Sequence, residues 1–411
     1  MSRNFAQNHI SSGIRDAKDM IRHTPEHIPP FLWGPPGIGK TDLVNQLAQE
    51  IGARVIVLKA SELRPEDLAG VPFPYEEGWT QFHPLRQLLE LTQGYPLLAR
   101  ARFAKLKANG DLPDGAEFEE PDQSKVVLFL DEFSNAQPDM VAPFQYLVLN
   151  RRIGGIEGHL LRDNVRIIAA GNREQDMAMT HDLTTPLKSR FMHIEVEPSL
   201  DEWIVWAREN EVLSTIMAFV RQRESQFHDF DPKTKDRTYP CPRSWAMLSD
   251  ALNGLDATDL SVERMRTLRR RQAEGLVGPG AAAEYIKFED VAVAAPTAED
   301  IIASPLDVST FEEQPDIAMV AIENLISAVR RHPDRFVDSG LVYVARMHAE
   351  YQTIFHTAIM NLHGDMPKEV IERVFDSDHW ETVRSNISRI DSVMRETERG
   401  PARSTGRLGI A

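Results

Sequence analysis

The chain has 411 residues, of which 42% are hydrophobic and 26% are charged, and its formal net charge at pH 7 is −16. A chain of this length and composition is expected to form roughly two to three globular domains. The acidic balance argues against a protein that wraps nucleic acid, because phosphate binding depends on clustered Lys and Arg. A single cysteine, Cys241, excludes internal disulfides and a cysteine-based zinc site, and it fits a reducing compartment.

The sequence predicts neither a signal peptide nor a membrane span. The first residues lack an apolar stretch, and no later window offers about 18 consecutive apolar residues. We therefore expect a cytoplasmic protein. Apolar residues recur at helical spacing between Ile10 and Ile21, which predicts a helix before the first strand.

A buried strand from Phe31, a glycine-rich turn and a helix start follow the pattern G-x-x-x-x-G-K-[ST]. The turn consists of Gly34, Pro35, Pro36, Gly37, Ile38, Gly39, Lys40 and Thr41. Backbone N–H groups of such a loop surround phosphate oxygens, Lys40 reaches the β- and γ-phosphates, and the Thr41 hydroxyl is placed for Mg²⁺. A turn that binds nothing has no use for this Lys-Thr pair. The sequence therefore predicts a nucleoside triphosphate site.

Alternating helical and apolar segments after the loop predict a parallel α/β sheet. Further strands are expected over 54–58, 126–130, 165–170 and 191–196. Residues 59–90 carry turn signals and short β-like pieces, which indicate an insertion that projects from the sheet. A helix over 85–108, interrupted near Gly94, an acidic loop over 109–123, a helix over 140–149 and a hairpin near 153–158 are also expected.

Polar residues follow two of these strands, where α/β folds bind ligands. Asp131 would bind the coordination sphere of Mg²⁺, and Glu132 would activate the attacking water. The alternative is that both acids only expose a polar strand end to solvent. Asn172 ends the next strand and could bind phosphate or water. Arg190 precedes the fifth strand, where it could reach the nucleotide of a neighbouring subunit. Arg243 opens a helix and could reach phosphate in its own subunit.

The second half of the chain is predicted to be helical. Helices are expected over 200–208, 212–226, 243–252, 263–274, 281–287, 317–331, 340–362, 368–375 and 380–395. Trp203 and Trp206 are three residues apart, which favours packing within these helices. His193 lies in an apolar strand and is expected to be a core histidine with a local hydrogen bond. Five arginines between Arg264 and Arg271 favour a solvated helix face or a subunit contact over a nucleic-acid patch.

The order of the motifs resembles an AAA+ ATPase, and more narrowly the MoxR branch, over about residues 10–290. The narrower resemblance is carried by the segments 67–70 (Asp-Leu-Ala-Gly), 130–132 (Leu-Asp-Glu), 170–172 (Ala-Gly-Asn), 186–191 (Pro-Leu-Lys-Ser-Arg-Phe) and 242–244 (Pro-Arg-Ser). The chain departs from the usual pattern in two ways. The stretch before Asp131 is long, and the helical region after about residue 300 exceeds a typical lid.

The resemblance implies an α/β fold class with an AAA+ P-loop core, a five-stranded parallel sheet of order 5-1-4-3-2 and an α-helical lid. The core is expected over residues 1–198, with an insertion over about 60–123 and a pre-sensor hairpin over about 151–161. The lid is expected over 199–290. A connector (291–314), an extra C-terminal helical region (315–398) and a disordered tail (399–411) complete the predicted organisation.

The same resemblance implies that ATP and Mg²⁺ bind between core and lid. Lys40, Thr41, Asp131 and Glu132 belong to the two Walker motifs, with Thr41 and Asp131 at the metal. Asn172 is then sensor 1, Arg190 the arginine finger and Arg243 sensor 2. Candidate contact residues for a partner are the aromatic residues of the insertion, although they could equally pack the insertion itself: Phe73, Tyr75, Trp79 and Phe82.

Three functional hypotheses follow. The first is an ATP-hydrolysing motor of MoxR type, assembled as a ring that is expected to be a hexamer, which remodels a protein client. The resemblance implies that such clients often carry a von Willebrand factor A domain. The second is a nucleic-acid motor or loader built on the same ATPase core. The third is a scaffold whose assembly is gated by ATP. A small-molecule kinase would leave the finger, the sensors and the lid without a role.

Overall fold

The computed structural model describes residues 11–74, 80–113, 115–154, 158–173, 176, 184–233, 236–362 and 364–398. The chain divides into two compact units. The first comprises residues 1–202 and 230–235, and the second comprises residues 203–229 and 236–411.

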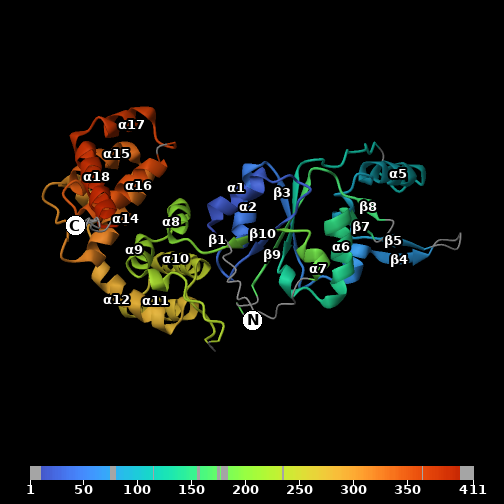
Figure 1. Ribbon diagram of the computed structural model, residues 1–411, viewed down its shortest axis with the longest axis horizontal. Coiled ribbons are helices and arrows are strands. Elements are labelled where there is room, and N and C mark those ends of the chain that lie inside the picture. Colours follow the sequence, from blue (N-terminus) through green and yellow to red (C-terminus); the bar gives the residue numbers. More distant parts are fainter. Residues whose placement is uncertain are drawn as a thin grey trace, which may run out of the picture. The chain divides into compact units, whose positions relative to one another are not determined.

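A parallel sheet forms the centre of the first unit (Figure 1). Its main strands are β2 (Pro30–Trp33), β3 (Arg54–Lys59), β6 (Val126–Asp131), β9 (Val165–Gly171) and β10 (Met192–Val196). They lie in the order β10-β2-β9-β6-β3, which confirms the predicted order 5-1-4-3-2. A two-residue strand, β1 (Ser11–Ser12), extends the sheet beyond β10 and was not expected from the sequence.

Helices cover both faces of this sheet, which explains why its central strands are apolar throughout. Alternate residues of β6 point to opposite faces, so Leu128 and Leu130 join one buried cluster while Val127 and Phe129 join the other. The first cluster is covered by α6 (Val141–Asn150), and the second by α1 (Ile14–His23) and α2 (Lys40–Glu50). Figure 1 shows α1 and α2 on one side of the sheet and α6 on the other.

Side chains from distant elements hold both ends of α1. At its start, the Glu202 carboxylate accepts a hydrogen bond from the Ile14 N–H at 2.6 Å. Gly13 permits this approach, because a Cβ there would lie 2.5 Å from Glu202 Oε1. At its end, the buried Arg166 donates to the carbonyls of Ile21 and Thr24. The Ile21 carbonyl also accepts from the Thr24 N–H, so Arg166 adds a second donor there and binds the Thr24 carbonyl directly beyond the helix.

The predicted insertion contains an antiparallel strand pair, β4 (Val71–Pro74) and β5 (Thr80–His83), which follows the short helix α3 (Pro65–Ala69). Gly70 is required between α3 and β4, because its φ is 89° and a Cβ would approach the His83 carbonyl carbon to 2.6 Å. The expected interrupted helix is found as α4 (Arg86–Leu89) and α5 (Tyr95–Ala108). The expected hairpin is formed by β7 (Arg152–Ile153) and β8 (His159–Leu160). A four-residue helix, α7 (Thr185–Lys188), precedes β10.

The second unit is helical in the part of the chain that the structure describes. Its helices are α8 (Leu200–Glu209, which begins in the first unit), α9 (Ser214–Gln222), α10 (Pro242–Asp256), α11 (Val262–Val277), α12 (Pro279–Ala292), α13 (Ala298–Ala303), α14 (Pro315–Arg331), α15 (Pro333–Val344), α16 (Ala349–Leu362), α17 (Lys368–Phe375) and α18 (Asp378–Glu398). Trp203 is buried against Phe227 and Trp206, with ring centroids 5.4 and 6.3 Å apart. The predicted packing role of this tryptophan pair is therefore confirmed.

The expected connector stays a prediction; it contains the short helix α13, whose start is capped by Thr297 and Asp300. One local prediction about this unit is wrong. The expected single helix over 340–362 is broken between α15 and α16. The buried Gln352 side chain donates to the carbonyls of Ala345 and Met347 in the break, which compensates for the lost helical hydrogen bonds. The predicted tail over 399–411 lies outside the described residues.

Candidate functional site

The phosphate loop predicted from the sequence joins the end of β2 to the start of α2. Gly37 and Gly39 have φ values of 81° and 97°, which side chains rarely tolerate. Gly34 lies so close to the next strand that a Cβ would approach the Val196 carbonyl oxygen to 2.5 Å. These three glycines let the loop curl while α2 begins at Lys40, so that the helix N-terminus faces the loop.

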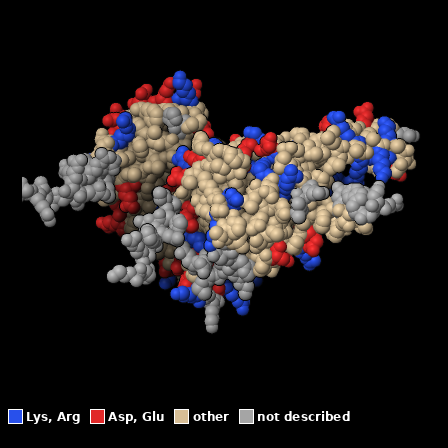
Figure 2. Space-filling view, turned by 45° about the vertical axis from the view of Figure 1, so that its right-hand side comes forward, with Lys and Arg blue, Asp and Glu red and all other residues tan. Residues whose placement is uncertain are grey.

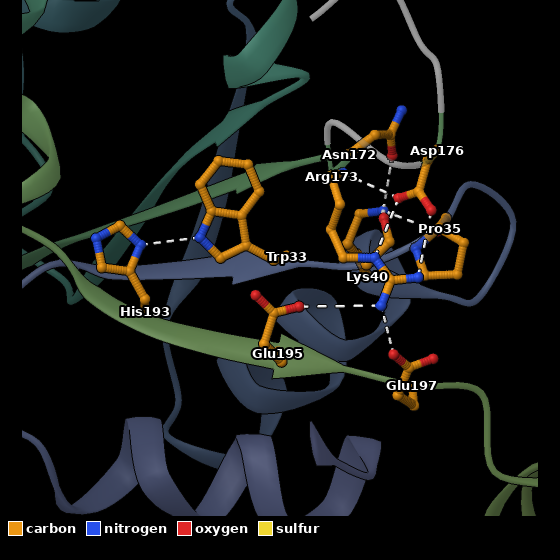
Figure 3. Close-up of polar contacts among 10 residues, drawn as sticks. Trp33, Pro35, Lys40, Asn172, Arg173, Asp176, His193, Glu195 and Glu197 are labelled. Atoms are coloured by element: carbon orange, nitrogen blue, oxygen red, sulfur yellow. Dashed lines mark hydrogen bonds and ion pairs between the residues drawn. The ribbon is translucent and has the colours of Figure 1, made fainter. Parts of the chain in front are cut away.

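Lys40 links this loop to the end of β9. Its ammonium group donates to the carbonyls of Gly34 and Pro35 at 2.7 and 2.9 Å, and to Asn172 Oδ1 at 3.0 Å (Figure 3). The side chain is only 9% exposed. Two residues that are far apart in the sequence are thus in direct contact at the edge of the sheet where the strands end.

The acid pair lies at the same edge. Thr41 donates from its hydroxyl to Asp131 Oδ2 at 3.1 Å, and the Glu132 N–H donates to Asp131 Oδ1 at 2.9 Å. A hydroxyl beside a carboxylate is the type of oxygen donor set that Mg²⁺ binds together with nucleotide phosphates, so these two residues fit the predicted metal. Among the described residues, no cluster of three or more His, Cys, Asp or Glu could hold a metal ion.

Glu132 has a left-handed backbone with φ 53° and ψ 32°, which costs about 1–2 kcal/mol for a residue with a side chain. Its carboxylate accepts a hydrogen bond from the hydroxyl of Ser61, which follows β3. Ser61 was not predicted from the sequence. A serine two residues beyond a strand carries no local signal, and only the strand order places it beside Glu132.

The end of β9 is held by two further groups that were not predicted from the sequence. The Asn172 N–H donates to the hydroxyl of the buried Ser134 at 3.1 Å, and a Cβ at Gly171 would lie 2.9 Å from the same oxygen. Arg173 makes ion pairs with Asp176 and Glu197. Although burial opposes the charge, these two acids raise the pKa of Arg173. Ser134 and Arg173 thereby anchor the backbone on both sides of Asn172 (Figure 3 shows Arg173).

The two other predicted arginines lie elsewhere. Arg190 is exposed just before β10, and within the described residues its guanidinium has no hydrogen-bond or ion-pair partner. Arg243 is exposed in the first turn of α10, in the second unit. Its predicted contact with the nucleotide stays a prediction.

The expectation that His193 is a core residue is wrong, because its side chain is exposed. Among the described residues, β1 pairs only with Glu195 and Val196, so His193 has a neighbouring strand on the β2 side alone, where its register partner is Phe31. The expected local hydrogen bond is confirmed and there are two of them. Trp33 Nε1 donates to His193 Nδ1 at 2.8 Å, and His193 Nε2 lies 2.7 Å from the Lys188 carbonyl oxygen.

Two of the four aromatic residues predicted to contact a partner lie in the described part of the insertion, and both are exposed. Phe73 and Phe82 are 59% and 45% exposed, although the Phe73 ring also contacts the His83 ring at 5.6 Å. Tyr75 and Trp79 lie outside the described residues. The arginine cluster of α11 is largely paired with acids, as in Arg269 with Glu289 and Arg270 with Glu274.

A phosphate loop at the carboxyl end of a parallel strand, with the acid pair and an amide at the same edge, defines a P-loop nucleotide-binding domain. Residues 30–198 match the family described as "ATPase family associated with various cellular activities (AAA)". The chain therefore contains an AAA ATPase domain, which is a type of domain that hydrolyses ATP.

Other comparisons are more limited. Over 34 residues the chain is 62% identical to the replication factor C large subunit of Pyrobaculum calidifontis, and over 68 residues it is 38% identical to that of Methanococcus aeolicus. These matches span 8% and 14% of the relatives and 8% and 16% of this chain. A RuvB mutant from Thermotoga maritima aligns with 72% of this chain and 73% of its own, at 15% identity and a TM-score of 0.26. NtrX from Brucella abortus aligns with 84% of this chain and 67% of its own, at 16% identity and a TM-score of 0.30.

None of the helices in the described ranges combines the length and the apolar character that a bilayer span needs.

Proposed function

We propose that this ATPase is a motor of MoxR type, which assembles into a ring, expected to be a hexamer, and remodels or activates a protein client. The observation that carries this proposal is the convergence of Lys40, Asn172, Thr41, Asp131 and Glu132 at one sheet edge, together with an exposed Arg190 at the other. A site made only of the five residues at the first edge can bind and position ATP. Fast phosphoryl transfer gains from an additional cation at the developing charge.

Each residue of the edge has a defined part in hydrolysis. Lys40 and the loop N–H groups hold the phosphates, while Thr41 and Asp131 hold Mg²⁺, which neutralises phosphate charge when bound. Glu132 orients and deprotonates the attacking water, and Asn172 hydrogen-bonds the water or the γ-phosphate. Arg243 is the proposed contact from the lid.

The topology supports a role for Arg190 in a neighbouring site. β10 runs parallel to β2, and Met192 pairs with Pro30, so Arg190 precedes the amino end of the strand pair. The loop begins at Gly34, after the carboxyl end of β2. The four steps along the strand from Pro30 to Gly34 span roughly 13 Å at about 3.3 Å each, which exceeds the reach of an arginine side chain. Arg190 therefore serves the nucleotide of the next subunit in our proposal.

The proposed client contact is the β4–β5 pair, which presents Phe73 and Phe82 to solvent. Exposed aromatic residues on a projecting strand pair provide a large apolar contact area for a protein surface. A client with a von Willebrand factor A domain is the partner that the MoxR resemblance favours.

Subunit mixing tests the shared site. Lys40→Ala removes ATP binding from a subunit but keeps its Arg190, whereas Arg190→Ala keeps the ATP site and removes the finger. Each variant alone should hydrolyse ATP poorly, with a loss of about 10³-fold or more expected for the finger. Mixed rings should regain part of the activity, because some intact sites face intact fingers. Glu132→Gln should bind ATP without turnover, and mixtures that stay inactive would argue against a shared site.

A nucleic-acid motor or loader is the second candidate. The named relatives are replication factor C subunits, although they match only short segments of this chain. Exposed cations on α5 favour this alternative: Arg100, Arg102, Lys105 and Lys107. In Figure 2, Lys and Arg also gather toward the end of the first unit where α5 lies, but elsewhere on that face they are interspersed with Asp and Glu.

The two candidates differ in a measurable way. A nucleic-acid motor should hydrolyse ATP faster when DNA or RNA is added, and this stimulation should fall steeply with salt. The variant Lys105→Gln/Lys107→Gln should then lose much of the stimulation. A protein remodeller should show neither effect, and its hydrolysis should respond to the client alone.

A further inference from the structure

A tryptophan and a histidine connect the phosphate loop to the segment that carries Arg190. Trp33 is the last residue of β2, directly before Gly34, and His193 is the second residue of β10. The two rings lie nearly parallel, with centroids 6.0 Å apart and planes at 22°. Figure 3 shows both side chains on one side of the sheet, with the indole N–H directed at the imidazole.

The hydrogen bonds assign the proton of the imidazole. An indole nitrogen can only donate, so His193 Nδ1 accepts from Trp33 at 2.8 Å. In the neutral ring the proton then lies on Nε2, which donates to the Lys188 carbonyl at 2.7 Å. Both nitrogens of His193 are used, and they form one continuous connection from the end of β2 to the end of α7.

The segment beyond Lys188 is short and is attached to the core. The Arg190 N–H donates to the Leu187 carbonyl at 3.0 Å, and Leu187 itself is buried in the core. Only Ser189 separates Lys188 from Arg190, so a shift of the Lys188 carbonyl moves the base of the Arg190 side chain. The backbone of Arg190 is thus held by the core on one side and by His193 on the other.

Stability alone gives little reason for this polar pair. His193 is exposed, and a hydrogen bond in such a place contributes only about 0.5–1.5 kcal/mol. The apolar packing around it is supplied by Phe31, which stacks on Trp33 at 4.1 Å and contacts the Phe191 ring at 5.2 Å. The pair adds a geometric constraint to this packing. Hydrogen bonds depend on distance and angle, so the two bonds of His193 restrict where Trp33 and Lys188 can lie relative to each other.

We propose that Trp33 and His193 are positioning residues that connect the ATP-binding loop of one subunit to the arginine finger which that subunit offers its neighbour. The inference rests on the proposed function of Arg190. A change of the loop at Gly34 moves Trp33, and the two hydrogen bonds carry the movement to Lys188 and hence to Arg190. Nucleotide binding in one site thereby sets the placement of the finger in the next.

The test uses the full-length protein with Trp33→Phe, which keeps an aromatic ring and removes the N–H donor, and His193→Phe as a second variant. Each should lower kcat by about fivefold, the rate equivalent of one hydrogen bond, while the Kd for an ATP analogue stays unchanged. Trp206→Phe, in the second unit, is the control and should leave both values as they are. A loss of ATP affinity, or an unchanged kcat in both variants, would overturn the proposal.

A double-mutant cycle with Arg190→Ala separates this proposal from the proposed function. In single-turnover assays with radiolabelled ATP, Trp33→Phe should have no further effect once Arg190 is absent. An equal fivefold loss in both backgrounds would show that Trp33 acts independently of the finger, which refutes the connection but leaves the finger intact. Full hydrolysis by Arg190→Ala alone would instead refute the proposed function, and the connection with it.

Discussion

Replacing Glu323 by Gln should destabilise the second unit far more than an exposed substitution of the same kind. The Glu323 side chain on α14 is completely buried. It accepts two parallel hydrogen bonds from Arg208 of α8, at 2.8 and 3.0 Å, and one from Arg221 of α9 at 3.1 Å. One carboxylate therefore joins three helices and compensates two guanidinium groups, which are 8% and 18% exposed.

The magnitude follows from what the substitution leaves behind. The glutamine side chain would keep the shape and one acceptor oxygen, but both arginine cations would lose the negative charge that they share. Breaking a buried ion pair costs about 3–5 kcal/mol, and the partial exposure of both arginines places this case near about 3 kcal/mol. In a domain of this size each kcal/mol lowers Tm by about 2–4 °C, so the transition should fall by roughly 6–12 °C.

Differential scanning calorimetry of the full-length protein measures this shift. Glu299→Gln is the matched control, because the Glu299 carboxylate lies 4.0 Å from Arg335 and is 62% exposed, so its loss should cost less than about 1 kcal/mol. Replacing all three buried charges by Met, Met and Leu should recover much of the stability. A shift for Glu323→Gln no larger than that of the control would refute the reasoning.

Three further predictions concern separate parts of the chain. Arg166→Met should lower the free energy of unfolding by about 1–3 kcal/mol in urea titrations, because the Thr24 carbonyl loses its guanidinium donor and the Ile21 carbonyl keeps only the Thr24 N–H; an unchanged midpoint would count against this role. Burial, with a smaller effect of Arg384, lowers the pKa of His356 below its ordinary 6.5, so the unfolded state binds the proton first and stability should fall as pH drops below about 6.5. His356→Phe should remove that part of the pH dependence of Tm, and a slope equal to the wild-type slope would contradict it. Ser134→Ala should lower kcat several-fold with little change in the Kd for ATP, since Asn172 loses the hydrogen bond that holds its backbone, and equal losses in binding and turnover would argue for a general disruption.

The sequence could predict most of the core because its signals are local. Apolar runs predicted the five main strands. The loop motif predicted the phosphate loop Gly34–Thr41 and the positions where it needs glycine. The order of the strands was predicted from the family resemblance, because the residues of a strand do not indicate which strands lie beside it. The places where local patterns failed, such as the helix break before α16, are stabilised by side chains like Gln352 that reach back from the next element.

By itself, the sequence determined which segments form strands and helices, where glycine must occur in the loop, and which residue types carry the phosphate chemistry. Only the tertiary structure decided that Lys40 contacts Asn172, that Ser61 and Ser134 support Glu132 and Asn172, and that His193 is exposed. The physical reason is distance along the chain. Backbone conformation depends on neighbouring residues, whereas a contact such as that between Lys40 and Asn172, 132 residues apart, depends on how the strands are ordered and packed.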